Sequence, residues 1–399
     1  MNRVLIIAHF CSDFIGNGNN RLNYLANLCA QRGHMVSFIT SDFSHNKKEK
    51  REGIIKDISY NVKMLHEPGY KKNVCISRFV SHYVFGKNLS KYLDTIEKPD
   101  IVYISIPSLD VGRAAVRYCG KNNIPLIVDI QDLWPEAFQL VFNIPVIKDV
   151  IFYPLKRTAD KIYKNADKLI AVSDTYLARG MSVNKKDKNG LCVFLGTDLN
   201  RFDKFKNSYD LKKDREFWVG YAGTLGHSYN ITIVMNALKK LKDKGYSDIV
   251  FKILGDGPLM DEFKCKAKGV GIQADFMGRL DYSKMVSVLY KCDIAVNPIS
   301  KGAAQSIINK HGDYAAAGLP VVSTQECPEY RTLISDYKCG FNCECENTDE
   351  VVDAIETLYN DPRLREEMGR NSRRLAEDKF DRSKTYKEII DTIESLANR

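Results

Sequence analysis

SKGAAQSIINKHGDYAAAGLP, residues 300–320, is the stretch on which the fold prediction rests. It follows the apolar run at residues 293–298, which predicts a buried strand. A glycine-containing loop and a short helix come next. The helix is expected to end at Gly318, because glycine commonly follows a helix and Pro320 cannot continue one. Another strand is predicted at Val321–Ser323. Strand, loop, helix and strand in this order are the unit of a doubly wound α/β sheet.

The start of this predicted helix is a candidate phosphate site. Backbone N–H groups at a helix N-terminus lack partners, and the helix dipole favours an anion there. Lys310 adds a full positive charge, and Asp313, farther along the helix, could accept a hydrogen bond from a sugar hydroxyl. The alternative is an amphipathic helix that only connects two buried strands, and this stretch alone does not separate the two interpretations.

The composition is that of a globular protein with about two domains, since 399 residues can form two separate cores. Hydrophobic residues make up 44% and charged residues 27%, which is ordinary for a soluble chain. No apolar run approaches the length of about 20 residues that a transmembrane helix needs. Val4–Ile7 is too short for a signal peptide and predicts a first strand instead.

The 11 cysteines are scattered singly, which favours reduced thiols and a cytoplasmic location. Cys327, Cys339, Cys343 and Cys345 lie close together in the sequence. A zinc site among them is a minor alternative, because they do not form regular C-x-x-C pairs.

The formal net charge is +9, and many basic residues lie between Lys47 and Lys91. They either form a solvated surface or attract anionic lipid headgroups and phosphate-bearing acceptors. Nucleic acid is not an expected partner, because no recognised binding signature accompanies the charge.

The first half of the chain repeats the strand–loop–helix pattern. An apolar strand at residues 4–8 leads to Gly16 and Gly18, then to a helix closed by Gly33. A dinucleotide-binding loop would need a third glycine where Arg21 stands, which argues against a nicotinamide or flavin cofactor.

A later predicted strand at residues 125–130 ends in Gln131–Glu136, which reads QDLWPE. Functional groups of open α/β sheets gather at the carboxyl ends of strands, so Asp132 could orient an acceptor hydroxyl. Trp134 could stack on a sugar, although packing in the core is the favoured interpretation for a large aromatic residue.

The second half restarts the pattern after a charged linker at residues 204–216. We therefore predict one domain at residues 1–205 and a second at residues 206–379, with a last helix at 380–399 packing back on the first domain. Two similar α/β domains imply a cleft between them, whose closure would exclude water.

Several motifs resemble those of the GT-B glycosyltransferases of family 4. Lys310–Tyr314 reads KHGDY and is similar to the Lys-x-x-Glu-Tyr form found in the subgroup that builds bacterial surface polysaccharides. The DLWPE run at residues 132–136, Gly196–Asp198 and Gly255–Pro258 extend the resemblance over nearly the whole chain. The chain departs from the family at Gln305, where many members have the first acid of their donor motif. It also lacks a basic pair after the loop at Gly223.

The resemblance implies a fold of two Rossmann-like domains and a retaining transfer of a sugar from a nucleotide-diphospho-sugar, UDP-linked. The implied pathway is O-antigen or capsule biosynthesis. The basic region from Lys47 to Lys91, the apolar stretch at residues 137–153 and the absence of a membrane span predict a lipid-linked saccharide acceptor met at an anionic membrane surface. The predicted location is therefore cytoplasmic, peripheral on the inner face of the membrane. No cofactor or metal is expected, and the chain contains no Asp-x-Asp.

The resemblance also implies roles for individual residues. Asp132 and Lys310 are the predicted catalytic residues, and Asp13, Arg21 and Trp134 the predicted acceptor ligands. The predicted donor ligands are Gly16, Gly18, Gly223, Thr224, Gly278, Arg279, Gln305, Ser306, Ile307, Ile308, Lys310 and Asp313.

Gln305 leaves alternatives open. An amide cannot act as a carboxylate nucleophile, so a covalent intermediate at this position is excluded. That agrees with front-face attack, but it also permits a pseudoenzyme that only binds a nucleotide-sugar. A sugar-nucleotide epimerase of the same fold is a third possibility, for which Asp132 and Asp13 are the only candidate carboxylates.

Overall fold

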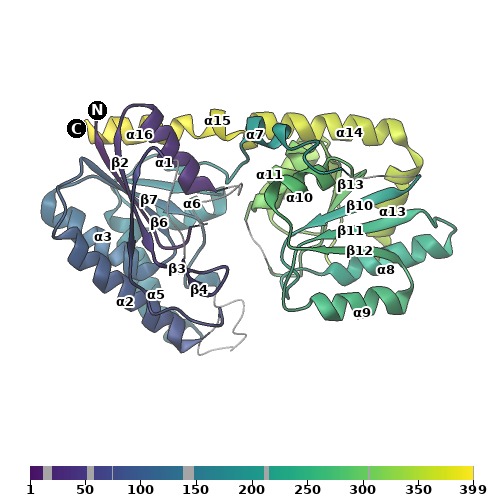
Figure 1. Cartoon of the computed structure of the whole chain (residues 1–399), viewed down its shortest axis with the longest axis horizontal. Coiled ribbons are helices and arrows are strands. Elements are labelled where there is room, and N and C mark those ends of the chain that lie inside the picture. Colours follow the sequence, from purple (N-terminus) through teal and green to yellow (C-terminus); the bar gives the residue numbers. More distant parts are fainter. Residues whose placement is uncertain are drawn as a thin grey trace. The chain divides into compact units, whose positions relative to one another are not determined.

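A computed structural model describes residues 1–11, 20–51, 58–73, 75–137, 148–210, 215–303 and 306–398. The chain forms two compact units (Figure 1). Unit 1 is Met1–Val193 with Tyr386–Arg399, and unit 2 is Phe194–Thr385.

The chain therefore enters the second unit after Val193, and not after residue 205 as predicted. Leu199 and Phe202 explain the difference, because both are buried in the same hydrophobic cluster as Trp218 of unit 2. Likewise the return to unit 1 begins at Tyr386 and not at residue 380.

Unit 1 is built on a seven-stranded sheet of order β5-β2-β1-β6-β7-β8-β9, in which every pair is parallel. The strands are β1 (Arg3–Ala8), β2 (Met35–Ser41), β5 (Asn61–Leu65), β6 (Ile101–Ile106), β7 (Leu126–Ile130), β8 (Lys168–Ala171) and β9 (Leu191–Cys192). A two-stranded antiparallel ribbon adds β3 (Phe43–Ser44) and β4 (Glu49–Lys50). The helices are α1 (Arg21–Gln31), α2 (Ile76–Leu93), α3 (Leu109–Asn122), α5 (Lys148–Asn165), α6 (Asp174–Met181) and α16 (Lys387–Ala397).

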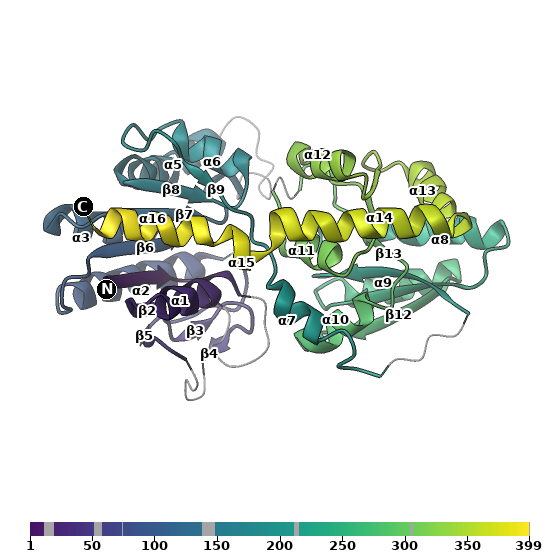
Figure 2. The same cartoon turned by 90° about the horizontal axis from the view of Figure 1, so that it is seen from above.

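Both faces of this sheet are covered, as the continuous apolar runs of its strands require. Leu5 and Ile7 of β1 face a cluster that includes residues of α2, α3 and α5. Ile6 points to the other face and packs with residues of α1 and α16. Figure 2 shows α16 running beside α1 over the strands.

Unit 2 contains a six-stranded parallel sheet of order β12-β11-β10-β13-β14-β15. The strands are β10 (Phe217–Ala222), β11 (Ile249–Leu254), β12 (Gln273–Gly278), β13 (Ile294–Asn297), β14 (Val321–Ser323) and β15 (Gly340–Asn342). The helices are α7 (Leu199–Lys204), α8 (Ile231–Asp243), α9 (Met260–Val270), α10 (Tyr282–Leu289), α11 (Asn309–Ala316), α12 (Pro328–Tyr337), α13 (Thr348–Asn360), α14 (Pro362–Leu375) and α15 (Arg382–Thr385), with a π-helical turn at Ala376–Phe380.

The predicted fold class, two doubly wound parallel-sheet domains, is confirmed. In each sheet the strand order reverses at one point, between β1 and β6 in unit 1 and between β10 and β13 in unit 2. Ligands of such sheets bind outside the carboxyl ends of the strands at this point. Within the described ranges, no helix has the length and apolar character to cross a bilayer.

Candidate functional site

Lys310 lies at the reversal point of unit 2, in the first turn of α11. Only 7% of the residue is exposed, and its Nζ atom has no hydrogen-bond partner among the described residues. The Nζ atom lies 4.2 Å from the ring centre of Tyr221 and 4.1 Å from that of Tyr229. Burial lowers the pKa of Lys310 well below its ordinary value, because the ammonium has lost its hydration. Within the described part of the chain, the Lys310 amine thus lies between two aromatic faces and has no ion-pair partner.

The loop after β10 leaves space for this side chain. Gly223 has φ +152°, and a Cβ atom there would lie 3.1 Å from Lys310 Nζ. Gly255, after β11, has φ +149°, and a Cβ atom there would lie 1.8 Å from the carbonyl oxygen of Gly223. The two glycines allow the loops after neighbouring strands to meet, which is a close backbone approach that other residues would prevent. Thr224 continues this loop, and its carbonyl accepts a hydrogen bond of 2.8 Å from the Tyr221 hydroxyl.

Helix α11 is fixed against β10 and β13 by buried hydrogen bonds. The Tyr314 hydroxyl accepts from the backbone N–H of Ala222 at 2.8 Å. At the start of the helix, the side chain of His311 accepts from the N–H of Ile308 at 3.3 Å, and its ring stacks on Tyr330 at 3.5 Å. Burial, followed by the charge of Lys310, lowers the pKa of His311, which keeps the imidazole neutral and able to accept.

The residues before α11 are also held in place. The side-chain amide of Gln325 donates to the carbonyl oxygen of Ser306 at 2.8 Å, and Asn297 at the end of β13 donates to Gln325 at 2.9 Å. Ile307 is buried in the core. Ser306, Ile307 and Ile308 therefore form a fixed approach to the helix N-terminus, where backbone N–H groups favour an anion.

Asp313 is buried one turn after Lys310. Its Oδ1 atom accepts a hydrogen bond of 2.7 Å from the Tyr282 hydroxyl and one of 3.0 Å from the Thr197 hydroxyl. Asp313 thus lies in a network of hydroxyl groups, which is the chemistry expected of a residue that binds ribose. Its ribose role stays a prediction.

Gly278 ends β12 at the same edge of the sheet, with φ +67°, and its carbonyl accepts from the N–H of Gly255 at 2.9 Å. Arg279 follows and is exposed. The order of the strands places Gly278 beyond β11, two strands from β10. The predicted donor ligands Gly16, Gly18 and Gln305, and the predicted acceptor ligand Asp13, lie outside the described residues.

Asp132 follows β7 at the carboxyl edge of the unit 1 sheet. Burial raises the pKa of this carboxyl group, although hydrogen bonds from the N–H of Leu133 at 2.9 Å and the hydroxyl of Tyr176 at 3.3 Å oppose the shift. A carboxylate at this position can accept a hydrogen bond from a sugar hydroxyl and so orient it. Trp134 is buried, with the guanidinium of Arg78 at 4.6 Å from its ring and His82 stacked at 5.6 Å, which corresponds to the packing interpretation.

Arg21, predicted to contact the acceptor, is buried in unit 1 and has a structural role instead. Its Nε and Nη2 atoms donate to the two oxygens of Asp129 at 3.0 and 3.2 Å. Its Nη1 atom donates to the carbonyl of Val193 at 2.9 Å and to the hydroxyl of Tyr386 at 3.2 Å. The guanidinium therefore joins β7 to the returning end of the chain. Arg78, one of the basic residues assigned to the surface, is buried as well.

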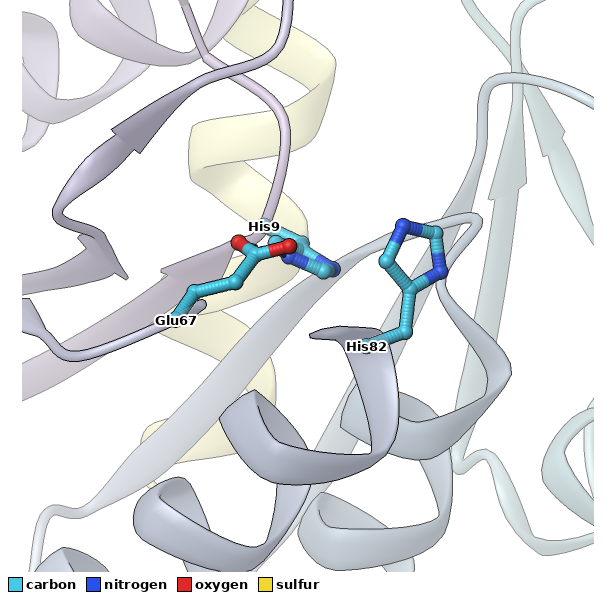
Figure 3. Close-up of side chains that lie close together, drawn as sticks. All are labelled: His9, Glu67 and His82. Carbon is cyan, nitrogen blue, oxygen red and sulfur yellow. Dashed lines mark hydrogen bonds and ion pairs between the residues drawn. The ribbon is translucent and has the colours of Figure 1, made fainter. Parts of the chain in front are cut away.

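His9, Glu67 and His82 form a buried cluster that the sequence did not indicate (Figure 3). They come from the ends of β1 and β5 and from α2, so no spacing in the sequence connects them. His9 Nε2 lies 2.7 Å from one Glu67 oxygen, and the hydroxyls of Ser41 and Ser81 donate to Glu67 at 2.6 and 2.7 Å. Burial acts to raise the pKa of Glu67, but these hydrogen bonds outweigh it and lower the pKa to about 2.

Two imidazoles and a carboxylate have the chemistry to bind a transition metal. Glu67 already accepts three hydrogen bonds, whereas the buried Nδ1 atom of His9 and Nε2 atom of His82 have no hydrogen-bond partner among the described residues. The cysteine zinc alternative is not supported among the described residues: Cys339 and Cys343 are buried in different hydrophobic clusters. The possible metal-ligand groups found there do not include a cysteine.

Two family models match this chain. Residues 201–375 match "Glycosyl transferases group 1", and residues 18–182 match "Glycosyltransferase Family 4". The chain belongs to the GT-B glycosyltransferases of family 4.

Two relatives with named activities are similar to this family 4 chain over part of their sequences. One is the GalNAc-alpha-(1->4)-GalNAc-alpha-(1->3)-diNAcBac-PP-undecaprenol alpha-1,4-N-acetyl-D-galactosaminyltransferase of Campylobacter jejuni, 25% identical over 195 residues, which are 48% of this chain and 52% of the relative. Another is the capsular polysaccharide biosynthesis glycosyltransferase CapM of Staphylococcus aureus, 23% identical over 56% of this chain and 60% of the relative. The chain thus spans only about half the length of these relatives.

Solved structures show the GT-B fold over the whole length. HepE of Anabaena in complex with UDP-glucose has a TM-score of 0.70 at 15% identity, over 99% of this chain and 100% of HepE. WaaG, a glycosyltransferase involved in lipopolysaccharide biosynthesis, has a TM-score of 0.66 at 16% identity, over 98% and 99% of the two chains.

Proposed function

We propose that this family 4 chain is a glycosyltransferase that moves a sugar from a UDP-linked nucleotide-diphospho-sugar to a saccharide acceptor in surface polysaccharide biosynthesis. The observation that carries the proposal is the buried amine of Lys310 at the reversal point of the unit 2 sheet, which lacks a hydrogen-bond partner in the described part of the chain. A buried cation without a partner is costly, and an incoming diphosphate would supply the missing partner.

In this proposal the donor binds along the carboxyl edge of unit 2. Lys310 and the backbone at Ser306–Ile308 neutralise the charge that develops on the leaving diphosphate. Asp313 holds the ribose hydroxyls, as it holds those of Tyr282 and Thr197 here. Because Lys310 supplies positive charge, we propose that transfer requires no metal cofactor.

The acceptor is proposed to bind in unit 1, with Asp132 orienting the attacking hydroxyl. An amide at Gln305 cannot form a glycosyl ester, so retention would follow front-face attack with the leaving phosphate as the base. The Campylobacter relative's name includes a diphosphate-linked undecaprenol. This supports a lipid-linked acceptor, and therefore an enzyme that works at the inner face of the cytoplasmic membrane.

The test is a thermal-shift screen of the purified chain with a panel of nucleotide-sugars. A ligand at a hundred times its Kd adds about 2.7 kcal/mol of stability. UDP and one UDP-sugar should raise Tm in the parent and in Lys264→Met, an exposed-lysine control on α9, but much less in Lys310→Met. An equal rise in Tm in all three proteins would contradict the assignment of Lys310 to the UDP-binding site. Conversion of the UDP-sugar to an epimer without any acceptor would identify an epimerase.

A further inference from the structure

His9, Glu67 and His82 meet at the carboxyl edge of the unit 1 sheet. His9 directly follows β1, Glu67 lies two residues after β5, and His82 belongs to α2. Figure 3 shows the imidazole of His9 between the carboxylate of Glu67 and the ring of His82. One possible ligand atom of each side chain lies within 4.8 Å of the other two. The exposed fraction is 2% for each histidine and 1% for Glu67, so the fold gathers these groups where water hardly reaches.

The described contacts leave an unused position on each of the three side chains. Glu67 accepts from Nε2 of His9, so this nitrogen carries the proton and Nδ1 of a neutral His9 presents a lone pair. His9 Nδ1 and His82 Nε2 are buried, and neither has a hydrogen-bond partner within the described ranges. A carboxylate has about four acceptor positions, and Glu67 uses three of them. Buried polar atoms are nearly always satisfied, so unused positions on three neighbouring side chains indicate a ligand.

We propose that His9, Glu67 and His82 bind a Zn²⁺ ion. Imidazole nitrogens and carboxylate oxygens bind zinc at about 2.0–2.2 Å, and three protein ligands with water in the fourth position form a tetrahedral site. Such ligand atoms are about 3.3–3.5 Å apart, so the three groups need to close by no more than about 1.5 Å. Ca²⁺ and Mg²⁺ are poorer occupants, because they prefer oxygen ligands. The proposal goes beyond the proposed function and does not rest on it, because no step of the sugar transfer uses this ion.

Neighbouring groups hold the proposed ligands in place, as outer partners commonly do at metal sites. The hydroxyl of Ser41, at the end of β2, donates to one oxygen of Glu67 at 2.6 Å, and the hydroxyl of Ser81 donates to the other at 2.7 Å. The ring of His9 stacks on that of Phe85, with 4.3 Å between the ring centres. Ligands that are fixed before the ion arrives lose little freedom on binding, which favours affinity.

Zinc at this position would join three elements that border the proposed acceptor site. It would connect the ends of β1 and β5 with α2 through His9, Glu67 and His82. The ring of His82 stacks on Trp134 with 5.6 Å between the ring centres, and Asp132 lies two residues before that tryptophan. Because the unfolded chain does not hold these ligands together, zinc should also stabilise the folded protein and raise its Tm.

The experiment is calorimetric titration of the full chain with ZnCl₂ after treatment with EDTA. We expect the parent to bind a single equivalent of zinc. His82→Gln and Glu67→Gln should each raise the Kd for zinc at least about 100-fold, because loss of even an outer partner costs about 10–100-fold in metal affinity. Two controls should bind like the parent. His227→Gln removes an exposed histidine of unit 2, and Cys11→Ser removes the thiol closest in sequence to His9.

Three outcomes of the titration overturn the proposal. They are absence of zinc binding in the parent, unchanged binding in both His82→Gln and Glu67→Gln, and loss of binding in Cys11→Ser, which would indicate a thiolate ligand.

Two further measurements do not depend on a variant that loses the site. X-ray absorption of the zinc-loaded parent should show nitrogen and oxygen ligands at about 2.0–2.2 Å, and a sulfur ligand at about 2.3 Å would overturn the ligand set. In Trp218→Phe, Trp134 is the only tryptophan. Co²⁺ bound in place of zinc should quench its fluorescence, because Trp134 stacks on His82. Unquenched emission from a protein with bound Co²⁺ would place the ion elsewhere and overturn the proposal.

Discussion

Replacement of Lys310 by methionine should separate binding from stability. Methionine keeps an unbranched side chain as far as Cε and removes the charged amine. In the parent, the ammonium loses its hydration and gains two aromatic faces at 4.2 and 4.1 Å, each worth about 2 kcal/mol at a desolvated site. The desolvation of an ion costs several kcal/mol, and exchanging buried ionic groups for apolar ones is often neutral or stabilising by about 1–4 kcal/mol. Lys310→Met should therefore be as stable as the parent or more stable.

The same substitution should weaken the binding of UDP. Loss of a charge-assisted contact to the diphosphate costs about 1.5–3 kcal/mol. This corresponds to a Kd for UDP that rises between roughly tenfold and 150-fold. Urea unfolding without ligand and calorimetric titration with UDP measure the two effects, with Lys264→Met as the matched control.

The pH dependence gives a further check on the same variant. Lys310 has its pKa lowered on folding from the ordinary 10.5, so the penalty is greatest where the lysine is charged in both states. It falls as the pH rises from the folded-state pKa towards 10.5. The stability advantage of Lys310→Met should shrink over that range. A variant that is less stable than the parent by more than about 1 kcal/mol would refute this reasoning, because the lysine would then be a structural residue.

Three other substitutions test Asp313 and Gly223 of unit 2 and Glu67 of unit 1. Asp313→Asn should bind UDP more weakly and discriminate less between ribose and 2′-deoxyribose donors, and equal discrimination in both proteins would remove Asp313 from the site. Glu67 has its pKa lowered from 4.5 to about 2, so it contributes up to about 3 kcal/mol above pH 4.5, and this is lost as the pH falls towards 2. The stability difference between the parent and Glu67→Gln should disappear over that interval in urea titrations at each pH; a constant difference would argue against the shift. Gly223→Ala should weaken UDP binding at least about tenfold, because alanine is strained at φ +152° and its methyl group, 3.1 Å from Lys310 Nζ, would displace that amine; unchanged calorimetric affinity would show that the loop adapts.

The strands and helices with a regular apolar pattern could be predicted from the sequence. The strand at residues 321–323 has the predicted bounds, because continuous apolar runs between breakers are typical of buried parallel strands. The helix before Gly318 was predicted from its C-terminal signals, and Gly318 has φ +68° as such a residue should. By contrast, β5 was missed, since its alternation of exposed and half-buried residues is typical of a sheet edge.

The contacts that side chains make in the candidate site were harder to predict from the sequence. The aromatic faces around Lys310 come from residues 81 and 89 positions earlier, Tyr229 and Tyr221, and no local pattern connects them. Arg21 pairs with Asp129 across 108 residues, so its position in a glycine-containing segment suggested a ligand contact where the structure has a core ion pair. Burial of a charged residue depends on such distant partners, and periodicity does not report them.

The return of α16 to unit 1 affects the order in which the protein can acquire its structure. Ile389, Ile390 and Ile393 cover the same apolar cluster as Leu25 and Val36. During translation, this cluster stays uncovered until all of unit 2 has been made, although N-terminal domains generally fold first. Unit 1 therefore matures last on the ribosome, and a fragment cut before Tyr386 would expose apolar surface that chaperones recognise.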